Sequence, residues 1–224
     1  MNAQNLQQFD FRACISILKS TGKKARNLRE LRDIISVVSQ DCLFHHTYQY
    51  FLKGHMLEYT SDFAHWAGES LEERALAEQL ANIDPYDLGS IDAVRSALVK
   101  VIDDYLVHFP EPREALAGDE FYFNETVSLV FPVGVRARNL AEFLAAIKYV
   151  DAACIYYHFF EARMRLGSGG NDFSSWMEKA LGKTDLALRV RSIDPFMHSL
   201  EDIRRHVVDA VEEFVRKDLE VPNP

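Results

Sequence analysis

Ala25-Arg26-Asn27-Leu28 recurs letter for letter as Ala137-Arg138-Asn139-Leu140, so the sequence repeats itself at an interval of 112 residues. The same shift aligns rarer residue types: Phe9 with Phe121, Phe11 with Phe123, Gly22 with Gly134, Cys42 with Cys154, and His46 with His158. Matches at such residues, in the same order along the chain, indicate an internal repeat.

After the histidines the interval shrinks to 110 residues, which indicates that two residues are missing from one loop. The matches at this interval are Asp62-Phe63 with Asp172-Phe173, Trp66 with Trp176, and Ile83-Asp84-Pro85 with Ile193-Asp194-Pro195. We therefore interpret the chain as a tandem duplication. The first copy covers residues 1–109, a linker covers 110–120, and the second copy covers 121–224.

Each copy is expected to begin with one short strand. Apolar or large side chains alternate with polar ones from Phe121 to Phe131, and residues 9–17 repeat this pattern more weakly. A period of two predicts a strand, and Gly22 or Gly134 is expected to end it. Because a lone strand leaves its backbone groups unpaired, the two strands are expected to pair around a pseudo-twofold axis, in one compact domain.

The rest of each copy is predicted to be helical. Asn27 with Glu30, and Asn139 with Glu142, have the spacing of a helix cap. Further helices are expected from about residue 41 to 57, from Asp62 or Asp172, and from Ser90 or Ser199, with a break at Gly182. The predicted fold class is mainly α, almost all-helical, with one short strand in each tandem-duplicated unit.

Composition restricts the classes of function. Hydrophobic residues make up 48% of the chain and charged residues 26%, which is ordinary for a globular protein. The net charge of −9 argues against binding to nucleic acid or to anionic lipid. The first residues have neither the positive charge nor the apolar core of a secretory signal, so none is expected. No apolar stretch is long enough to predict a membrane span. With three cysteines far apart, we expect reduced thiols in a cytoplasmic protein, monomeric by default.

The first candidate site is the pattern Cys42-x-x-x-His46, repeated as Cys154-x-x-x-His158. Residues four apart share a helix face, so each copy would place a thiol beside an imidazole. If the two faces meet, they could form a tetrahedral zinc site, and a single pair could serve as nucleophile and base. Packing in an aromatic core is the alternative that we favour, so no cofactor is expected unless this zinc site forms.

The second candidate site is the cationic loop before the first helix of each copy. Its residues are Lys24, Arg26 and Asn27 in the first copy, and Arg136, Arg138 and Asn139 in the second. A helix N-terminus attracts anions, so these loops could bind a small anionic ligand. Solvated side chains or pairs with nearby carboxylates are the alternative.

Asp62 and Asp172 form a third candidate, as acids acting with His46 and His158. Their positions are explained more simply as helix N-caps.

Together, the motif Gly-x-x-Ala-Arg-Asn-Leu, the aromatic segment with histidine, Asp-Phe-x-x-Trp and Ile-Asp-Pro resemble a bacterial and archaeal family defined by a domain of unknown function. The resemblance covers nearly the whole chain and implies no activity. We expect a binding or scaffold protein that recognises a small anionic ligand or a protein partner. A metalloprotein or an enzyme that uses the Cys–His pairs is the alternative.

Overall fold

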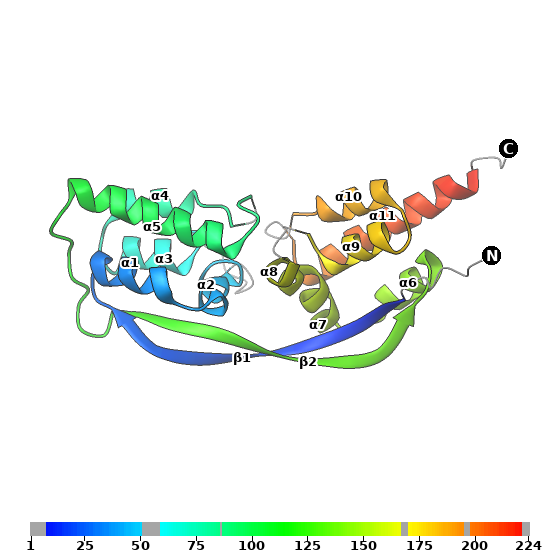
Figure 1. Cartoon of the computed structure of the whole chain (residues 1–224), viewed down its shortest axis with the longest axis horizontal. Helices are drawn as coiled ribbons and strands as arrows, with labels where there is room; N and C mark the ends of the chain where they lie inside the picture. The colour runs from blue at the N-terminus through cyan, green and yellow to red at the C-terminus, as the bar shows by residue number, and fades with distance from the viewer. Residues whose placement is uncertain (1–7, 51–58, 86, 167–169, 195–197, 221–224) are drawn as a thin grey trace. The chain divides into compact units, whose positions relative to one another are not determined.

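The computed structural model describes all 224 residues except 1–7, 51–58, 86, 167–169, 195–197 and 221–224. A long strand opens each half of the chain, and helices follow it (Figure 1). The first half contains β1 (Phe9–Ala25), α1 (Leu28–Val37), α2 (Gln40–His46), α3 (Asp62–Glu69), α4 (Arg74–Ala81) and α5 (Ile91–His108). The second half contains β2 (Phe121–Ala137), α6 (Leu140–Ile147), α7 (Ala152–Ile155), the π-helix η2 (Tyr156–Glu161), α8 (Ala162–Leu166), α9 (Asp172–Lys179), α10 (Thr184–Arg191) and α11 (Leu200–Glu220).

The strands are not short, and this corrects the predicted fold class. β1 and β2 are 17 residues long each and pair with one another in a two-stranded sheet. They run antiparallel (Figure 1). The expected pairing of the two strands is therefore confirmed, whereas an almost all-helical chain with one short strand per copy is wrong.

Gly22 and Gly134 explain why the strand length was underestimated. Both lie inside the strands that they were expected to end, with φ of +73° and +76°. Glycine adopts positive φ without the steric cost of a Cβ, so it changes the local backbone direction while the strand continues. Each strand thus ends at Ala25 or Ala137, two residues before the asparagine that caps the next helix.

The chain forms two compact units, and the boundary between them falls within both strands. We call residues 16–128 with 167–169 the α1–α5 unit, and residues 1–15, 129–166 and 170–224 the α6–α11 unit. Each unit contains one half of each strand, so these units differ from the sequence copies 1–109 and 121–224. The division into two copies, their origin by duplication and their pseudo-twofold relation stay predictions.

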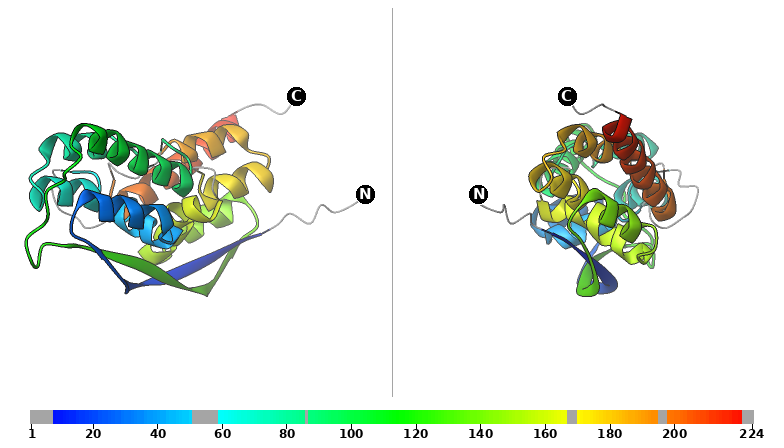
Figure 2. Two further views of the ribbon diagram at one scale, coloured as in Figure 1. Left: turned by 60° about the vertical axis from the view of Figure 1, so that its left-hand side comes forward. Right: turned by 90° about the vertical axis from the view of Figure 1, so that its right-hand side faces the viewer.

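In the α6–α11 unit, the beginning of β1 supplies aromatic side chains to the helices. The Phe9 ring centroid lies 5.7 Å from that of Phe143, 5.5 Å from that of Phe173 and 5.5 Å from that of Trp176. Phe11 is also buried among them. The α11 helix packs along α10 and α6 (Figure 2). Residues from both ends of the sequence therefore share one hydrophobic core.

In the α1–α5 unit, the beginning of β2 plays the corresponding part. The Phe121 ring stacks on Phe63 with centroids 5.0 Å apart and meets Trp66 edge-on at 5.8 Å. Within each unit, the start of a strand from one half of the sequence packs on helices from the other half. Sequence periodicity could not predict these contacts between the two halves. Alternation shows that one face of a strand is buried, but it does not show which helices cover that face.

Several predicted helix boundaries are confirmed. Asn27 and Asn139 cap α1 and α6 by accepting from the N–H groups of Glu30 and Glu142. Ser90 caps α5. The helix expected from about residue 41 to 57 begins as α2 but ends at His46, with Thr47 as its C-cap, so the prediction is wrong for residues 47–50; residues 51–58 lie outside the described part. Gly182, with φ of +66°, lies between α9 and α10 at the predicted break.

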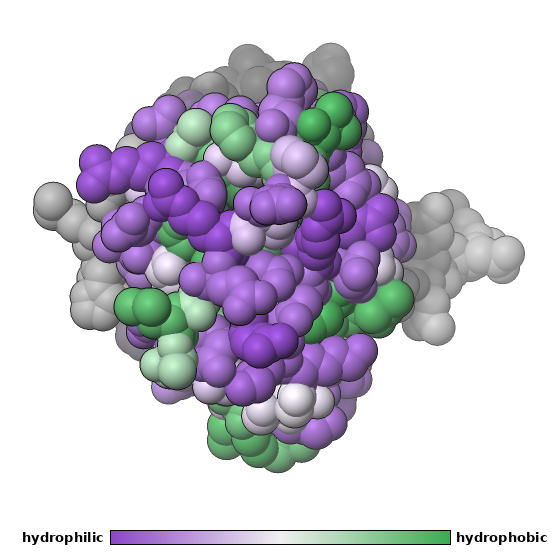
Figure 3. Space-filling model, turned by 90° about the vertical axis from the view of Figure 1, so that its left-hand side faces the viewer, coloured by the Kyte–Doolittle hydropathy of each residue, from purple (hydrophilic) through white to green (hydrophobic). Residues whose placement is uncertain are grey.

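None of the helices in the described ranges combines the length and the apolar character needed to cross a bilayer. The face of the α1–α5 unit drawn in Figure 3 is mainly hydrophilic, with hydrophobic side chains scattered between charged and polar ones. Scattered hydrophobic residues on such a surface are normal and need no partner to explain them.

Candidate functional site

His158 joins a strand and a helix in the α6–α11 unit. Its Nε2 atom accepts a hydrogen bond from the backbone N–H of Arg12 at 2.9 Å, and its Nδ1 lies 2.8 Å from Oδ2 of Asp172. A nitrogen that accepts from an N–H carries no proton, so the ring proton is on Nδ1, which donates a hydrogen bond to Asp172. The imidazole is therefore neutral, with both nitrogens in use.

His46 makes the same contacts in the α1–α5 unit. Its Nε2 accepts from the backbone N–H of Asn124 at 2.9 Å, and its Nδ1 lies 2.7 Å from Oδ2 of Asp62. We call these two arrangements the His158 clamp and the His46 clamp. Each gives a hydrogen-bond partner to a strand N–H group that would otherwise be costly to bury.

The clamps correct the interpretation of the two aspartates as N-caps. Ser61 and Asn171 cap α3 and α9, and Asp62 and Asp172 occupy the next position of each helix. There a carboxylate is favoured by the helix dipole while it accepts from the histidine. The alternative pairing with His46 and His158 is thus the observed contact. In the closed clamp this contact is structural, because Nε2 of each ring accepts from a backbone N–H and so does not face a substrate as a general base.

The cysteines of the predicted zinc site are fully buried. Burial raises the pKa of Cys42 to about 12 and raises that of Cys154 above its usual value. Thiolates are the form that attacks substrates and binds zinc, so a neutral buried thiol fits core packing better. Neither a zinc site at Cys42, His46, Cys154 and His158 nor a nucleophilic pair gains support from this geometry.

A different cluster has the composition of a cation site. Among the described residues, His45, His46 and Asp62 offer ligand atoms within 4.8 Å of one another. The His46 nitrogens, however, are both engaged in the clamp, and Nδ1 of His45 lies 3.0 Å from both Gln49 and Thr126. The cluster therefore satisfies its polar atoms with protein partners.

The cationic loops already interact with carboxylates of the chain itself. Lys24 pairs with Glu120 at 3.0 Å, and Arg136 pairs with Asp10 at 2.8 Å. The carboxylates of Glu30 and Glu142 accept from the backbone N–H groups of Arg26 and Arg138, just ahead of the helices that Asn27 and Asn139 cap. Anion binding at these six predicted residues stays a prediction, and any external anion would have to displace these carboxylates.

A pocket of about 480 Å³ lies in the α6–α11 unit, beside the His158 clamp. It was not predicted from the sequence. Its charged lining residues are Asp10, Arg12, Arg165, Asp172 and Lys179, and its aromatic ones are Phe9, Tyr157 and Trp176. The π-helix η2 supplies Tyr157 and His158, and such helices occur often at functional sites.

Most of the charges in this pocket are paired. Arg165 donates to Asp172 at 2.8 Å and lies over the Tyr157 ring, 4.2 Å from its centroid. Asp10 is the partner of Arg136. Arg12 and Lys179 differ, because neither side chain has an ion-pair or hydrogen-bond partner in the part of the chain that the structure describes. The pocket therefore presents two unpaired cations beside aromatic walls.

The sequence does contain a signal for this pocket, in the differences between the copies rather than in their matches. Arg12 corresponds to Asn124 at the 112-residue interval, and Lys179 corresponds to Glu69 at the 110-residue interval. Only the α6–α11 unit therefore has these two cations next to its clamp. The candidate sites were chosen from features that both copies share, so Arg12 and Lys179 were not among them.

Comparisons with known proteins place the chain in a family. The model of a family of unknown function, DUF5752, matches residues 6–212, and the chain belongs to this family. A solved structure, described as the structure of OrfY from Thermoproteus tenax, is 33% identical, with a TM-score of 0.79 over 92% of this chain and 95% of that one. No functionally curated protein matches the chain.

Proposed function

For this member of a family of unknown function, we propose a binding role: the pocket of the α6–α11 unit takes up a small anionic ligand. The observation that supports this is the pair of unpaired cations, Arg12 and Lys179, in one pocket. A cation without a protein partner in a concave site is available to a ligand carboxylate, sulfate or phosphate group, and guanidinium suits such groups through its several donors.

The rest of the pocket fits an organic anion. Its volume of about 480 Å³ lies within the usual range of roughly 300–1,000 Å³ for small-molecule sites. Phe9, Tyr157 and Trp176 offer apolar surface to the uncharged part of the ligand. The proposal includes a cytoplasmic, monomeric protein descended from a duplicated ancestor, in which only one unit kept or gained the anion site.

Binding can be measured by titration calorimetry of the purified full-length chain. Inorganic sulfate and phosphate test the anion subsite alone, and benzoate and phenyl phosphate add a ring that could lie against the aromatic wall. Arg12→Gln and Lys179→Gln remove one unpaired cation each. We expect each to weaken anion binding about tenfold or more, since hydrogen bonds to charged groups contribute about 1.5–3 kcal/mol.

Lys100→Gln is the matched control. Lys100 is an exposed cation on α5 of the other unit, and its ion-pair partner among the described residues is Asp104. Its loss should change the general surface charge but not the pocket. The proposal is overturned if no anion binds saturably, or if Lys100→Gln weakens binding as much as the two pocket variants.

A further inference from the structure

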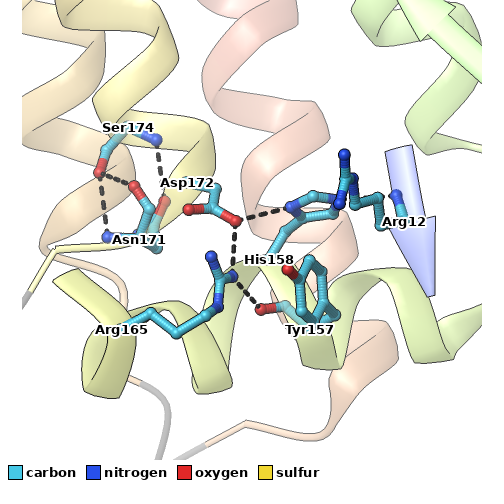
Figure 4. A network of polar contacts seen from close by, with 7 residues as sticks. All are labelled: Arg12, Tyr157, His158, Arg165, Asn171, Asp172 and Ser174. Atoms are coloured by element: carbon cyan, nitrogen blue, oxygen red, sulfur yellow. Dashed lines mark hydrogen bonds and ion pairs between the residues drawn. The ribbon is translucent and has the colours of Figure 1, made fainter. Parts of the chain in front are cut away.

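The backbone of Arg12 is held by the His158 clamp, while the Arg12 side chain lines the pocket. The N–H of Arg12 donates to Nε2 of His158, and both residues are in the pocket wall. Figure 4 shows His158 between β1, which carries Arg12, and Asp172. The position of the Arg12 side chain in the pocket therefore depends on a backbone hydrogen bond, and only the neutral imidazole can be its acceptor.

The second arginine of the pocket is tied to the same clamp. Oδ2 of Asp172 accepts from Nδ1 of His158 and from the Arg165 guanidinium, each at 2.8 Å (Figure 4). Arg165 also donates to the backbone oxygen of Tyr157 at 3.2 Å. One chain of hydrogen bonds thus runs from Arg12 through His158 and Asp172 to Arg165.

From this geometry, and resting on the proposed function, we infer that His158 is a positioning residue of the anion pocket. Its neutral form holds Arg12 and Arg165 in place, and its protonation releases the ligand. An imidazolium has two N–H donors and no acceptor. In a protonated His158, the Nε2–H donor would therefore point at the Arg12 N–H donor, and the hydrogen bond between them would be lost. The strand segment that carries Arg12 would then lose its attachment to the pocket.

The groups around His158 favour the neutral form. Arg12 on β1 and Arg165 on α8 oppose a positive charge on the ring, while Asp172 on α9 favours it. The rings of Phe9, Tyr157 and Phe173 enclose the imidazole. Burial is the largest influence and, with the two arginines, holds the pKa of His158 below its ordinary value despite Asp172. The clamp is therefore intact at neutral pH and opens in acid.

The His46 clamp separates this role from a general structural one. His46 makes the same two hydrogen bonds in a unit that has Asn124 and Glu69 in place of Arg12 and Lys179. Replacing His46 should remove a similar set of bonds from the fold without touching the anion pocket.

The test uses sulfate, because its charge does not change between pH 8 and pH 5. We expect the affinity of the wild-type chain for sulfate to be constant above the ordinary histidine pKa of about 6.5 and to fall as the pH is lowered further. Ordinary surface histidines would produce the opposite trend, since added positive charge strengthens anion binding. His158→Gln should bind sulfate about tenfold more weakly at pH 8 and with little dependence on pH. His46→Gln should keep both the wild-type affinity and the wild-type pH profile.

The outcomes separate the inference from the proposed function. If sulfate binds through Arg12 but His158→Gln changes neither affinity nor pH profile, the inference is wrong and the proposed function stands. If the wild-type chain binds none of the four anions saturably, both fail; if it binds an aromatic anion but no sulfate, benzoate replaces sulfate in the same comparison of variants. Should His158→Gln not fold, the ¹H–¹⁵N signal of the Arg12 amide in the wild-type chain decides. It must shift at the pH at which sulfate affinity falls, and an unchanged signal there overturns the inference.

Discussion

The imidazole of His158 accepts a hydrogen bond from the backbone N–H of Arg12, which lies 146 residues earlier in the chain. His46 and Asn124, 78 residues apart, form the corresponding bond in the other compact unit. Neither unit can complete its clamp from one sequence copy. The beginning of each strand must reach the helices of the other half before the histidine can accept its hydrogen bond, so both clamps are long-range contacts with a high entropic cost of closure.

Loss of the His46 clamp should destabilise the chain substantially. His46→Ala leaves the Asn124 N–H and the Asp62 carboxylate without their partner and opens a cavity beside Phe63 and Phe121. We expect the free energy of unfolding to fall by about 2–4 kcal/mol. His46→Gln, which keeps an amide able to accept from Asn124, should lose less. Urea unfolding of the three proteins measures this, and equal losses in Ala and Gln would show that the hydrogen bonds contribute little.

The strands show how far sequence reasoning reached and where it stopped. Alternation of residues predicted a strand in each half, and the need to pair backbone groups predicted that the strands would meet, which they do. Gly22 and Gly134 were misread, because a glycine is compatible with either the end of a strand or a bend within it. The partner of each buried strand face depends on contacts between residues more than 50 positions apart in the sequence, and no local pattern reports those.

The candidate site was predictable only in part. Cysteines were favoured as the partners of His46 and His158, and N-caps were preferred for Asp62 and Asp172. The structure instead pairs each histidine with its aspartate, which was the less favoured alternative. Helical spacing suggested the Cys–His pairing, whereas the true partner comes from the following helix, through a loop whose path the sequence does not give. Arg12 and Lys179 share no pattern with each other and meet only in the folded unit.

Gly22→Ala should be destabilising although the space for a methyl group is open. Nothing lies within 4 Å of the Cβ that would be added, but φ is +73°. An L-residue in this region costs about 1–2 kcal/mol, and the penalty here is backbone strain alone. Lys23→Ala, at the exposed neighbouring strand position, is the control and should change the free energy of unfolding by less than about 0.5 kcal/mol. Equal effects of the two substitutions would mean that the positive φ is not required.

The His158 clamp should also make stability depend on pH. The pKa of His158 is lowered in the folded protein, chiefly by burial, so below its ordinary value of about 6.5 the unfolded chain binds a proton that the folded chain does not. The stability contributed by neutral His158 is therefore complete above this pH and declines as the pH falls towards the folded pKa. The difference in unfolding free energy between the wild-type chain and His158→Gln should shrink from pH 7.5 to pH 5. A difference that stays constant over this range would refute the assignment of a buried neutral ring.

Metal analysis tests the remaining sequence hypothesis. Because the Cys42 thiol has a pKa of about 12 and both nitrogens of His46 are hydrogen-bonded, zinc would have to remove a proton from a buried thiol and break the clamp to bind there. We expect elemental mass spectrometry of the purified, untagged chain to find zinc well below one equivalent. The Cys42→Ala and Cys154→Ala double variant should then lose only about 1–3 kcal/mol per site through packing. Stoichiometric zinc that disappears in this variant would instead establish the Cys–His pairs as a metal centre and require a rearrangement of both clamps.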